Sequence, residues 1–563
     1  YTADIQDSDV MVTFLANPDV QQAFDVLVGN IGRALDDRAE LSVFARRIVA
    51  SHCTKPWTEP ILDTWILERR VASVSMPDPI VAAAPHADLQ ALVVIHGMGE
   101  QIPMDTIKDF VNAVWQKDDA ITPHWLPHPT EVWSKPDART GSLELRRITT
   151  RESIASAPEF PAGVRTDFYE LYWADLTAGT TWDSLKAWVS GLLFRPLSRV
   201  PPGVRLAWLV LWLGSLIVVA LAILAVLPAS LWTEPRFAAL GVWKWLLTAA
   251  AVALTALVHR MGTSTLGRVV RYTRADPDNI AARAAVRDRG LKLLRALHDG
   301  PHYKRIIIVA HSLGTMLAHD LLSYFWAERE ATRTVKEGTP EFAALCTLEH
   351  AAAQLEQAPS DPVRLKAYLV AQREFRRQLA GRPAPAAPDQ RDPRWLISDL
   401  VTFGNPLTHA EFLIAADHAD LEARKTAREL PQSPPFREFL DPNVLKRAEA
   451  TQAMPIANPA DQTRLISYPV VNATGTWMLH HAAPFAAVRW TNVYDPATLV
   501  FFGDVIGGPL APVFGPAIID INLKQLRGGR QSWTFTHTKY WALDEASRIE
   551  ACREAVNLLD RPI

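Results

Sequence analysis

Five consecutive residues, Ala310-His311-Ser312-Leu313-Gly314, have the types and spacing that a nucleophilic serine requires. A serine hydroxyl is a weak nucleophile at neutral pH, so a hydrolase holds it beside a base and presents its oxygen away from the main chain. A sharp strand-to-helix turn does this, and its crowding demands small residues two positions before and two after the serine. Ala310 and Gly314 fill these positions. The alternative is a serine that only caps a helix after a core strand.

The residues on either side of Ser312 predict the strand and the helix that such a turn joins. Residues 305–310 form a short apolar run rich in isoleucine and valine, which is typical of a buried strand. Residues 315–324 continue with the apolar periodicity of a helix. We therefore expect Ser312 to be the nucleophile of an acyl transfer. The backbone N–H of Leu313 is an expected donor to the oxyanion that forms.

A second expected oxyanion donor lies on an earlier loop. Residues 91–95 (Ala-Leu-Val-Val-Ile) read as a buried strand that ends in His96-Gly97-Met98-Gly99. Glycines let a backbone bend close to a substrate, so Gly97 and Gly99 leave the Met98 N–H as the expected donor. We expect His96 to orient this loop rather than to react. The alternative is an ordinary glycine-rich turn.

The acid and the base are sought after Ser312, because hydrolases with this turn carry serine, acid and histidine in that chain order. Asp504 follows a predicted strand at 489–494, and His537 follows one at 518–523. We expect His537 to accept the serine proton, while Asp504 fixes the histidine tautomer and stabilises the imidazolium. Asp495 lies nearer its strand end and is the alternative acid, although the proline after it favours a turn.

These motifs together resemble lipase-like α/β hydrolases. The segments that carry the resemblance are Val94–Gln101, Ile308–Gly314, Val401–Pro406 (Val-Thr-Phe-Gly-Asn-Pro), Trp490–Asp495 with Gly503-Asp504, and Thr536-His537. The resemblance implies an α/β-hydrolase fold, a mostly parallel sheet with helices on both faces. It also implies ester hydrolysis through an acyl-serine intermediate, with no cofactor and no metal. It leaves the ester unidentified.

Two long apolar segments predict a membrane hairpin. Residues 206–227 contain no charge and residues 238–258 only Lys244, and each would span roughly 30 Å as a helix. Basic residues flank the outer ends, so the positive-inside rule predicts a cytoplasmic catalytic body on an integral protein of a bacterial inner membrane. The preceding segment, 182–197, could lie on the bilayer as an amphipathic helix or pack on the protein. The alternative for the spans is a pair of central helices in a large core.

The remaining organisation follows from these landmarks. We expect a helical N-terminal region, a hydrolase body divided by the hairpin, and a helical cap with a proline- and alanine-rich linker. The corresponding ranges are 1–88 (helical region), 89–181 (first part of the body), 182–260 (amphipathic segment and hairpin), 261–320 (Ser312 turn), 321–393 (cap) and 394–563 (acid and histidine).

Composition excludes several classes of function. The net charge of -3 gives no basic field of the kind that nucleic-acid binders use. Three distant cysteines, Cys53, Cys346 and Cys552, predict neither a disulfide framework nor a zinc site. The leading hypothesis is a membrane-anchored lipase or phospholipase. The alternatives are a carboxylesterase or thioesterase acting on soluble or protein-linked acyl groups, and a catalytically inactive scaffold. The oligomeric state, a homo-oligomer included, stays open.

Overall fold

The computed structural model describes the chain between Asp88 and Pro562, with gaps. Contacts divide the chain into residues 1–86 and 87–563, and only the second unit contains described residues. The predicted N-terminal helical region, most of the segment 182–197 and the second predicted span, apart from Ala249, therefore lie outside them. The undescribed residues are 1–87, 98–101, 123–131, 143, 178–193, 201–204, 227–248, 250–271, 273–276, 301, 386–390, 440–463, 499–501 and 563.

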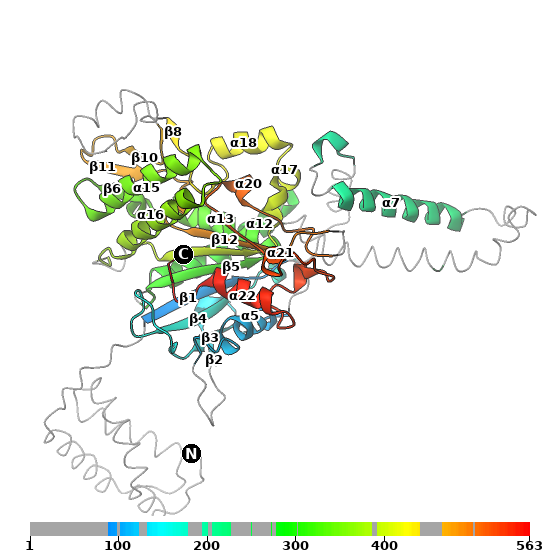
Figure 1. Cartoon of the computed structure of the whole chain (residues 1–563), viewed down its shortest axis with the longest axis horizontal. Coiled ribbons are helices and arrows are strands. Elements are labelled where there is room, and N and C mark those ends of the chain that lie inside the picture. The colour runs from blue at the N-terminus through cyan, green and yellow to red at the C-terminus, as the bar shows by residue number, and fades with distance from the viewer. Residues whose placement is uncertain are drawn as a thin grey trace, which may run out of the picture. The chain divides into compact units, whose positions relative to one another are not determined.

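An eight-stranded sheet in the order β13-β12-β7-β5-β1-β4-β3-β2 forms the centre of the described unit (Figure 1). The six strands from β13 to β4 pair in parallel, and β3 and β2 add an antiparallel edge. This confirms the predicted α/β class with a mostly parallel sheet. The strands are β1 (Asp88–Ile95), β2 (Val132–Pro136), β3 (Arg146–Thr150), β4 (Val164–Leu171), β5 (Arg305–His311), β7 (Ile397–Phe403), β12 (Arg489–Tyr494) and β13 (Ile519–Asn522).

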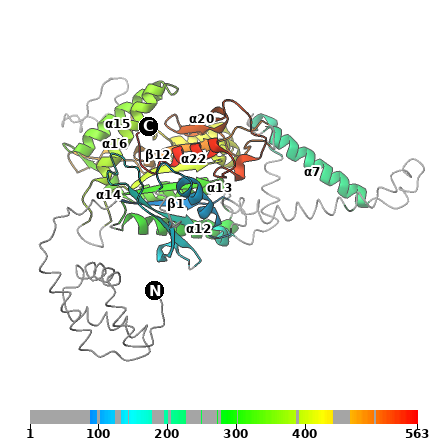
Figure 2. The same cartoon turned by 60° about the horizontal axis from the view of Figure 1, so that its bottom comes forward.

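Side chains alternate between the two faces of this sheet, and each face is covered by helices (Figure 2). Ile306 and Ile308 of β5 enter one apolar core, and Ile307 and Val309 enter the other. The first core is closed by α12 (Pro277–His298), α13 (Leu313–Ala327), α15 (Pro340–Gln357) and α16 (Pro362–Ala380). The second is closed by α5 (Asp105–Val111), η1 (Asn112–Gln116) and α22 (Ala546–Val556).

Most predicted strands are present, with one shift. The run from Asp167 to Ala174 predicts a further strand, and the structure places that strand three residues earlier, as β4. Trp173 leaves the sheet and donates two hydrogen bonds to His96. The β2–β3 hairpin was not predicted, nor were two small sheets whose short strands carry little apolar periodicity. These strands are β6 (Thr334–Lys336), β10 (Ser467–Pro469) and β11 (Thr476–Leu479) in one sheet, and β8 (Glu438–Phe439) and β9 (Arg464–Leu465) in the other.

The predicted insertion at 321–393 contains the expected helices, but its contacts do not support a cap over Ser312. Tyr368 and Gln372 of α16 donate hydrogen bonds to the Phe485 carbonyl, shortly before β12 begins. Arg376 of α16 reaches the Ser398 carbonyl near the start of β7. Ser312 instead follows the end of β5. Because the three strands are parallel, these contacts of α16 lie at the opposite end of the sheet from Ser312.

The first predicted span is helical as α7 (Arg205–Val226). Among the helices that the structure describes, none is both long and apolar enough to cross a membrane, so the predicted hairpin has no support there. Short elements complete the description: η2 (Ala138–Thr140), η3 (Ala174–Thr177), η4 (Leu197–Arg199), α14 (Glu330–Arg333), η7 (Pro406–His409), α17 (Ala410–Leu413), α18 (His418–Thr426), η8 (Pro484–Ala486), α20 (Ala511–Phe514), α21 (Leu523–Leu526) and η9 (Thr536–Thr538).

Candidate active site

Ser312 occupies a tight turn between β5 and α13. Its backbone has φ +53° and ψ −129°, a strained conformation for a residue with a side chain. Such strain persists only where the surrounding structure enforces it. Gly314 allows this close approach, because a Cβ there would lie 2.4 Å from the His96 carbonyl oxygen. The predicted need for a small residue two positions after the serine therefore has a direct steric cause.

The structure brings Ser312, His537 and Asp504 together. Ser312 Oγ lies 2.8 Å from His537 Nε2, and His537 Nδ1 lies 3.0 Å from each carboxylate oxygen of Asp504. All three residues are buried, with 2%, 5% and 1% exposure respectively. A carboxylate only accepts hydrogen bonds, so the imidazole proton sits on Nδ1 and Nε2 is left to accept the serine proton. This arrangement can pass a proton from the hydroxyl to the imidazole.

Three donors besides His537 bind the carboxylate of Asp504. Its Oδ1 accepts from the backbone N–H groups of Ile506 and Gly507, at 2.8 and 3.0 Å. Its Oδ2 accepts from the Tyr540 hydroxyl at 2.6 Å. Burial alone would raise the pKa of Asp504, but the hydrogen bonds from His537, Tyr540 and Gly507 outweigh it and hold that pKa below its usual value. The acid is therefore kept ionised next to the histidine.

Asp495, the alternative acid, lies elsewhere in the same network. Its side chain forms an ion pair with Arg527 and accepts a 2.6 Å hydrogen bond from the Thr536 hydroxyl. It therefore holds the residue immediately before His537 and does not contact the imidazole. The geometry favours Asp504 as the acid and gives Asp495 a supporting position.

The loop after β1 passes directly beside the serine. A Cβ on Gly97 would lie 2.8 Å from Ser312 Cβ. His96 Nε2 accepts from the Trp173 N–H at 3.1 Å, so its Nδ1 carries the proton and donates to the Gly97 carbonyl at 2.8 Å. This agrees with the expectation that His96 orients the loop. The other two predicted loop residues, Met98 and Gly99, lie outside the described residues.

The other predicted oxyanion donor, Leu313, is the first residue of α13. The backbone N–H groups of the first helical turn have no partner within their own helix. The Leu313 N–H is therefore oriented by the turn and available to a negative charge beside Ser312. The helix dipole adds to this effect, because its positive end lies at the same turn.

Sequence reasoning missed His311 as a positioning residue. Its Nε2 lies 2.6 Å from the His537 carbonyl oxygen, and because a carbonyl only accepts, Nε2 is the donor. Burial, with the neighbouring His537, lowers the pKa of His311 to about 3, so the ring is neutral at physiological pH. The residue before the nucleophile thus fixes the backbone of the proposed base. No local pattern in the sequence reveals this contact.

Gly404 and Tyr540 were also missed. Gly404 has φ +56°, and a Cβ there would lie 2.8 Å from Asp504 Oδ2 and 2.9 Å from both His537 Nδ1 and Tyr540 Cε2. Glycine is therefore required just after β7, where the backbone lies against the side chains of Asp504, His537 and Tyr540. The signals were present, since Gly404 belongs to the Thr-Phe-Gly-Asn-Pro segment and Tyr540 follows His537 by three residues. Only the folded structure shows that they meet.

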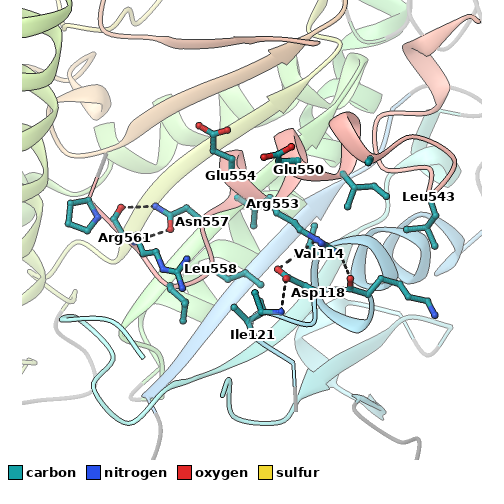
Figure 3. Close-up of a pocket in the computed structure, with 17 residues that line it drawn as sticks. Val114, Asp118, Ile121, Leu543, Glu550, Arg553, Glu554, Asn557, Leu558 and Arg561 are labelled. Carbon is teal, nitrogen blue, oxygen red and sulfur yellow. Dashed lines mark hydrogen bonds and ion pairs between the residues drawn. The ribbon is translucent and has the colours of Figure 1, made fainter. Parts of the chain in front are cut away.

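A large groove elsewhere in the molecule is separate from these residues. It has a volume of about 1130 Å³ and lies between η1 and α22 (Figure 3). None of Ser312, His537 and Asp504 lines it. Its wall includes Leu558, whose carbonyl accepts hydrogen bonds from Gln90 near the start of β1 and Arg305 at the start of β5. The groove therefore extends to the end of the sheet opposite Ser312.

One described cluster has the composition of a metal site: His298, Asp299 and Asp392. Asp299 forms an ion pair with Arg329, and Asp392 forms one with Arg394. His298 Nε2 accepts a hydrogen bond from a backbone N–H at 3.2 Å, which leaves the proton on its other ring nitrogen. The cluster is therefore organised as an ion-pair network, with its carboxylates already neutralised by arginines.

Comparison with known proteins adds no family to this description. No family model, no curated protein and no solved structure matches the chain.

Proposed function

We propose that the chain is a serine hydrolase that cleaves carboxylic esters through an acyl-serine intermediate. The observation that carries the proposal is the unbroken hydrogen-bond chain from Ser312 Oγ through His537 to Asp504. As the serine oxygen attacks the ester carbonyl carbon, His537 takes the hydroxyl proton and then returns it to the departing alcohol oxygen. A water molecule activated by His537 then releases the acid and restores Ser312.

Two further features support this proposal. The Leu313 N–H and the predicted second donor, the Met98 N–H, would together stabilise the negative oxygen of the tetrahedral intermediate. The strained turn at Ser312, placed between a central parallel strand and a helix, is the position that α/β hydrolases give their nucleophile. The resemblance to lipase-like α/β hydrolases points the same way.

We further propose that the ester belongs to a lipid. Helix α7 exposes eight large apolar side chains, an unusual surface for contact with water alone. The start of α7 is tied to the body, because Trp208 packs on Val200 and Phe412, and Arg195 donates to the Phe412 carbonyl at 2.8 Å. Phe412 belongs to α17, shortly after Gly404. The exposed residues are Leu206, Leu209, Val210, Leu213, Leu216, Ile217, Val219 and Ile223.

Ester turnover by matched variants tests the proposal. Ser312→Ala and His537→Ala should each lower kcat by about 10⁴-fold or more, because the members of a triad act as a unit. Ser323→Ala is the control, since Ser323 lies on the same helix and bonds only to the His319 carbonyl among described partners. It should keep near-normal turnover. Absence of turnover in the wild type with p-nitrophenyl esters and with phospholipid vesicles would contradict the proposal and favour the inactive-scaffold alternative.

The same substrates separate the two enzyme alternatives. A lipid hydrolase should prefer long acyl chains or vesicles, whereas a carboxylesterase or thioesterase should turn over only short or soluble substrates. Turnover confined to short soluble esters would therefore contradict the lipid proposal while leaving Ser312 as the nucleophile.

A further inference from the structure

The two loops that carry Asp504 and His537 also carry three aromatic side chains. Trp533 is 78% exposed, Phe535 is 38% exposed and Phe502 is half-buried. The rings of Phe502 and Trp533 meet edge to face with centroids 5.5 Å apart. The Phe535 ring lies 5.9 Å from the imidazole of His537. Aromatic surface therefore begins beside the proposed base and continues on both loops.

Backbone hydrogen bonds fix these aromatic residues relative to Asp504 and His537. The Gly503 N–H donates to the Thr534 carbonyl, and the Thr536 N–H donates to the Gly503 carbonyl, both at 3.0 Å. Phe502 and Phe535 stand beside this pairing, which places one aromatic residue on each paired segment. Gly503 has φ +78°, and a Cβ there would lie 2.6 Å from the Pro496 carbonyl oxygen. The three aromatic residues therefore belong to the two hydrogen-bonded segments that carry the acid and the base.

The chemistry of this surface indicates an apolar partner. An indole with most of its area in water gains stability when it is covered by hydrocarbon. The guanidinium of Arg527, on the same loop, forms ion pairs with Asp495 and Glu545. Its charge is therefore already satisfied and is not offered to an anionic headgroup. The exposed aromatic area therefore points to a partner that covers these rings with hydrocarbon.

We propose that Phe502, Trp533 and Phe535 form a platform that binds the hydrocarbon chain of the ester substrate. The inference rests on the proposed hydrolase function and names the part of the substrate that this site recognises. The position of Phe535 supports it, because His537 must contact the oxygen of the reacting ester. The chain attached to that ester starts within reach of the nearest ring.

Chain-length dependence tests the platform. The kcat/KM values for p-nitrophenyl butyrate and p-nitrophenyl decanoate are compared below the concentrations at which either ester aggregates. Trp533→Ala and Phe535→Ala should lower kcat/KM for decanoate about tenfold more than kcat/KM for butyrate, mainly through KM. Phe535→Leu should retain most decanoate turnover, because it keeps apolar contact. Phe439→Ala is the control: it removes an aromatic ring that is 71% exposed on β8, and kcat/KM should stay the same for both esters.

Several results would overturn the platform. An equal loss on both esters would show that the rings position the loops rather than bind the chain. Unchanged decanoate turnover in the variants would contradict a chain-binding role. If those variants also bound phosphatidylcholine vesicles more weakly, the rings would be assigned to membrane docking instead. A wild-type protein that hydrolyses butyrate but not decanoate would contradict this inference and leave the proposed hydrolase function standing. A wild type that hydrolyses neither ester and no phospholipid vesicles overturns the proposed function and this inference with it.

Discussion

Replacing Tyr540 with phenylalanine removes one hydroxyl group from the centre of the site. That hydroxyl donates to Asp504 Oδ2 at 2.6 Å. The ring itself is buried and lies against Phe403, with centroids 5.8 Å apart. Phenylalanine keeps this packing, so the substitution tests the hydrogen bond and not the fold. The remaining described partner of Oδ2 is His537 Nδ1.

The size of the effect follows from the charge on Asp504. A hydrogen bond to an ionised group contributes about 1.5–3 kcal/mol. If Asp504 stabilises the imidazolium in the transition state, losing this bond should lower kcat/KM by about 10- to 100-fold. Two backbone N–H groups still hold Oδ1, so activity should fall rather than vanish. The acid side of the kcat/KM profile should move to higher pH, because the Tyr540 hydrogen bond is one of the causes that keep the pKa of Asp504 low.

The assay measures ester turnover across pH for Tyr540→Phe beside Tyr468→Phe. Tyr468 is a matched control, because its hydroxyl contacts Met478 in the small sheet and not the site. The melting temperature of each variant checks that the fold is kept. Unchanged kcat/KM and an unchanged pH profile in a folded Tyr540→Phe protein would refute the reasoning that Tyr540 positions the acid.

Three further predictions follow from the same contacts. Gly404→Ala should lower kcat by about 100-fold or more in a turnover assay, because its Cβ would lie within 2.9 Å of three site residues and its φ is left-handed; normal kcat would contradict the crowding. Asp504→Asn should lower kcat by about 10⁴-fold, whereas Asp495→Asn should mainly lower the melting temperature; the reverse result would reassign the acid. Burial raises the pKa of Glu170 to about 7, so the folded protein keeps a proton that the unfolded chain releases near pH 4.5. Its contribution to stability is therefore full below that pH and is lost as pH rises through about 7, by roughly 3 kcal/mol. Glu170→Gln should remove this loss in denaturant titrations at pH 5 and 8, while the exposed control Glu152→Gln should leave it in place.

The parts of the fold that could be predicted from the sequence depend on short-range patterns. A buried parallel strand is an apolar run whatever its neighbours are, so β5 and β12 were located almost to the residue, and β1 was located at its C-terminal end but begins three residues earlier than expected. The turn at Ser312 is specified within five residues by its own crowding. The chain order of nucleophile, acid and histidine then led to Asp504 and His537, and the structure brings both to Ser312.

The parts that were missed depend on contacts between distant segments. Tyr540, His311 and Gly404 acquire their positions only when β5, β7 and the histidine loop meet at one end of the sheet. The helices at 321–393 were expected, but apolar periodicity does not say at which end of a sheet a helix packs, and the contacts of α16 lie at the end of the sheet opposite Ser312. The end of β4 was shifted because Trp173 bonds to His96, a contact that no local pattern encodes.

An active-site-directed phosphonate tests the central claim most directly. A fluorophosphonate should react once per folded chain, and peptide mass spectrometry should find the adduct on Ser312. Labelling should disappear after heat denaturation and in His537→Ala, because the probe requires a serine oxygen activated by its base. No adduct on the folded wild type, or an adduct on another residue, would contradict the assignment of Ser312 as the nucleophile.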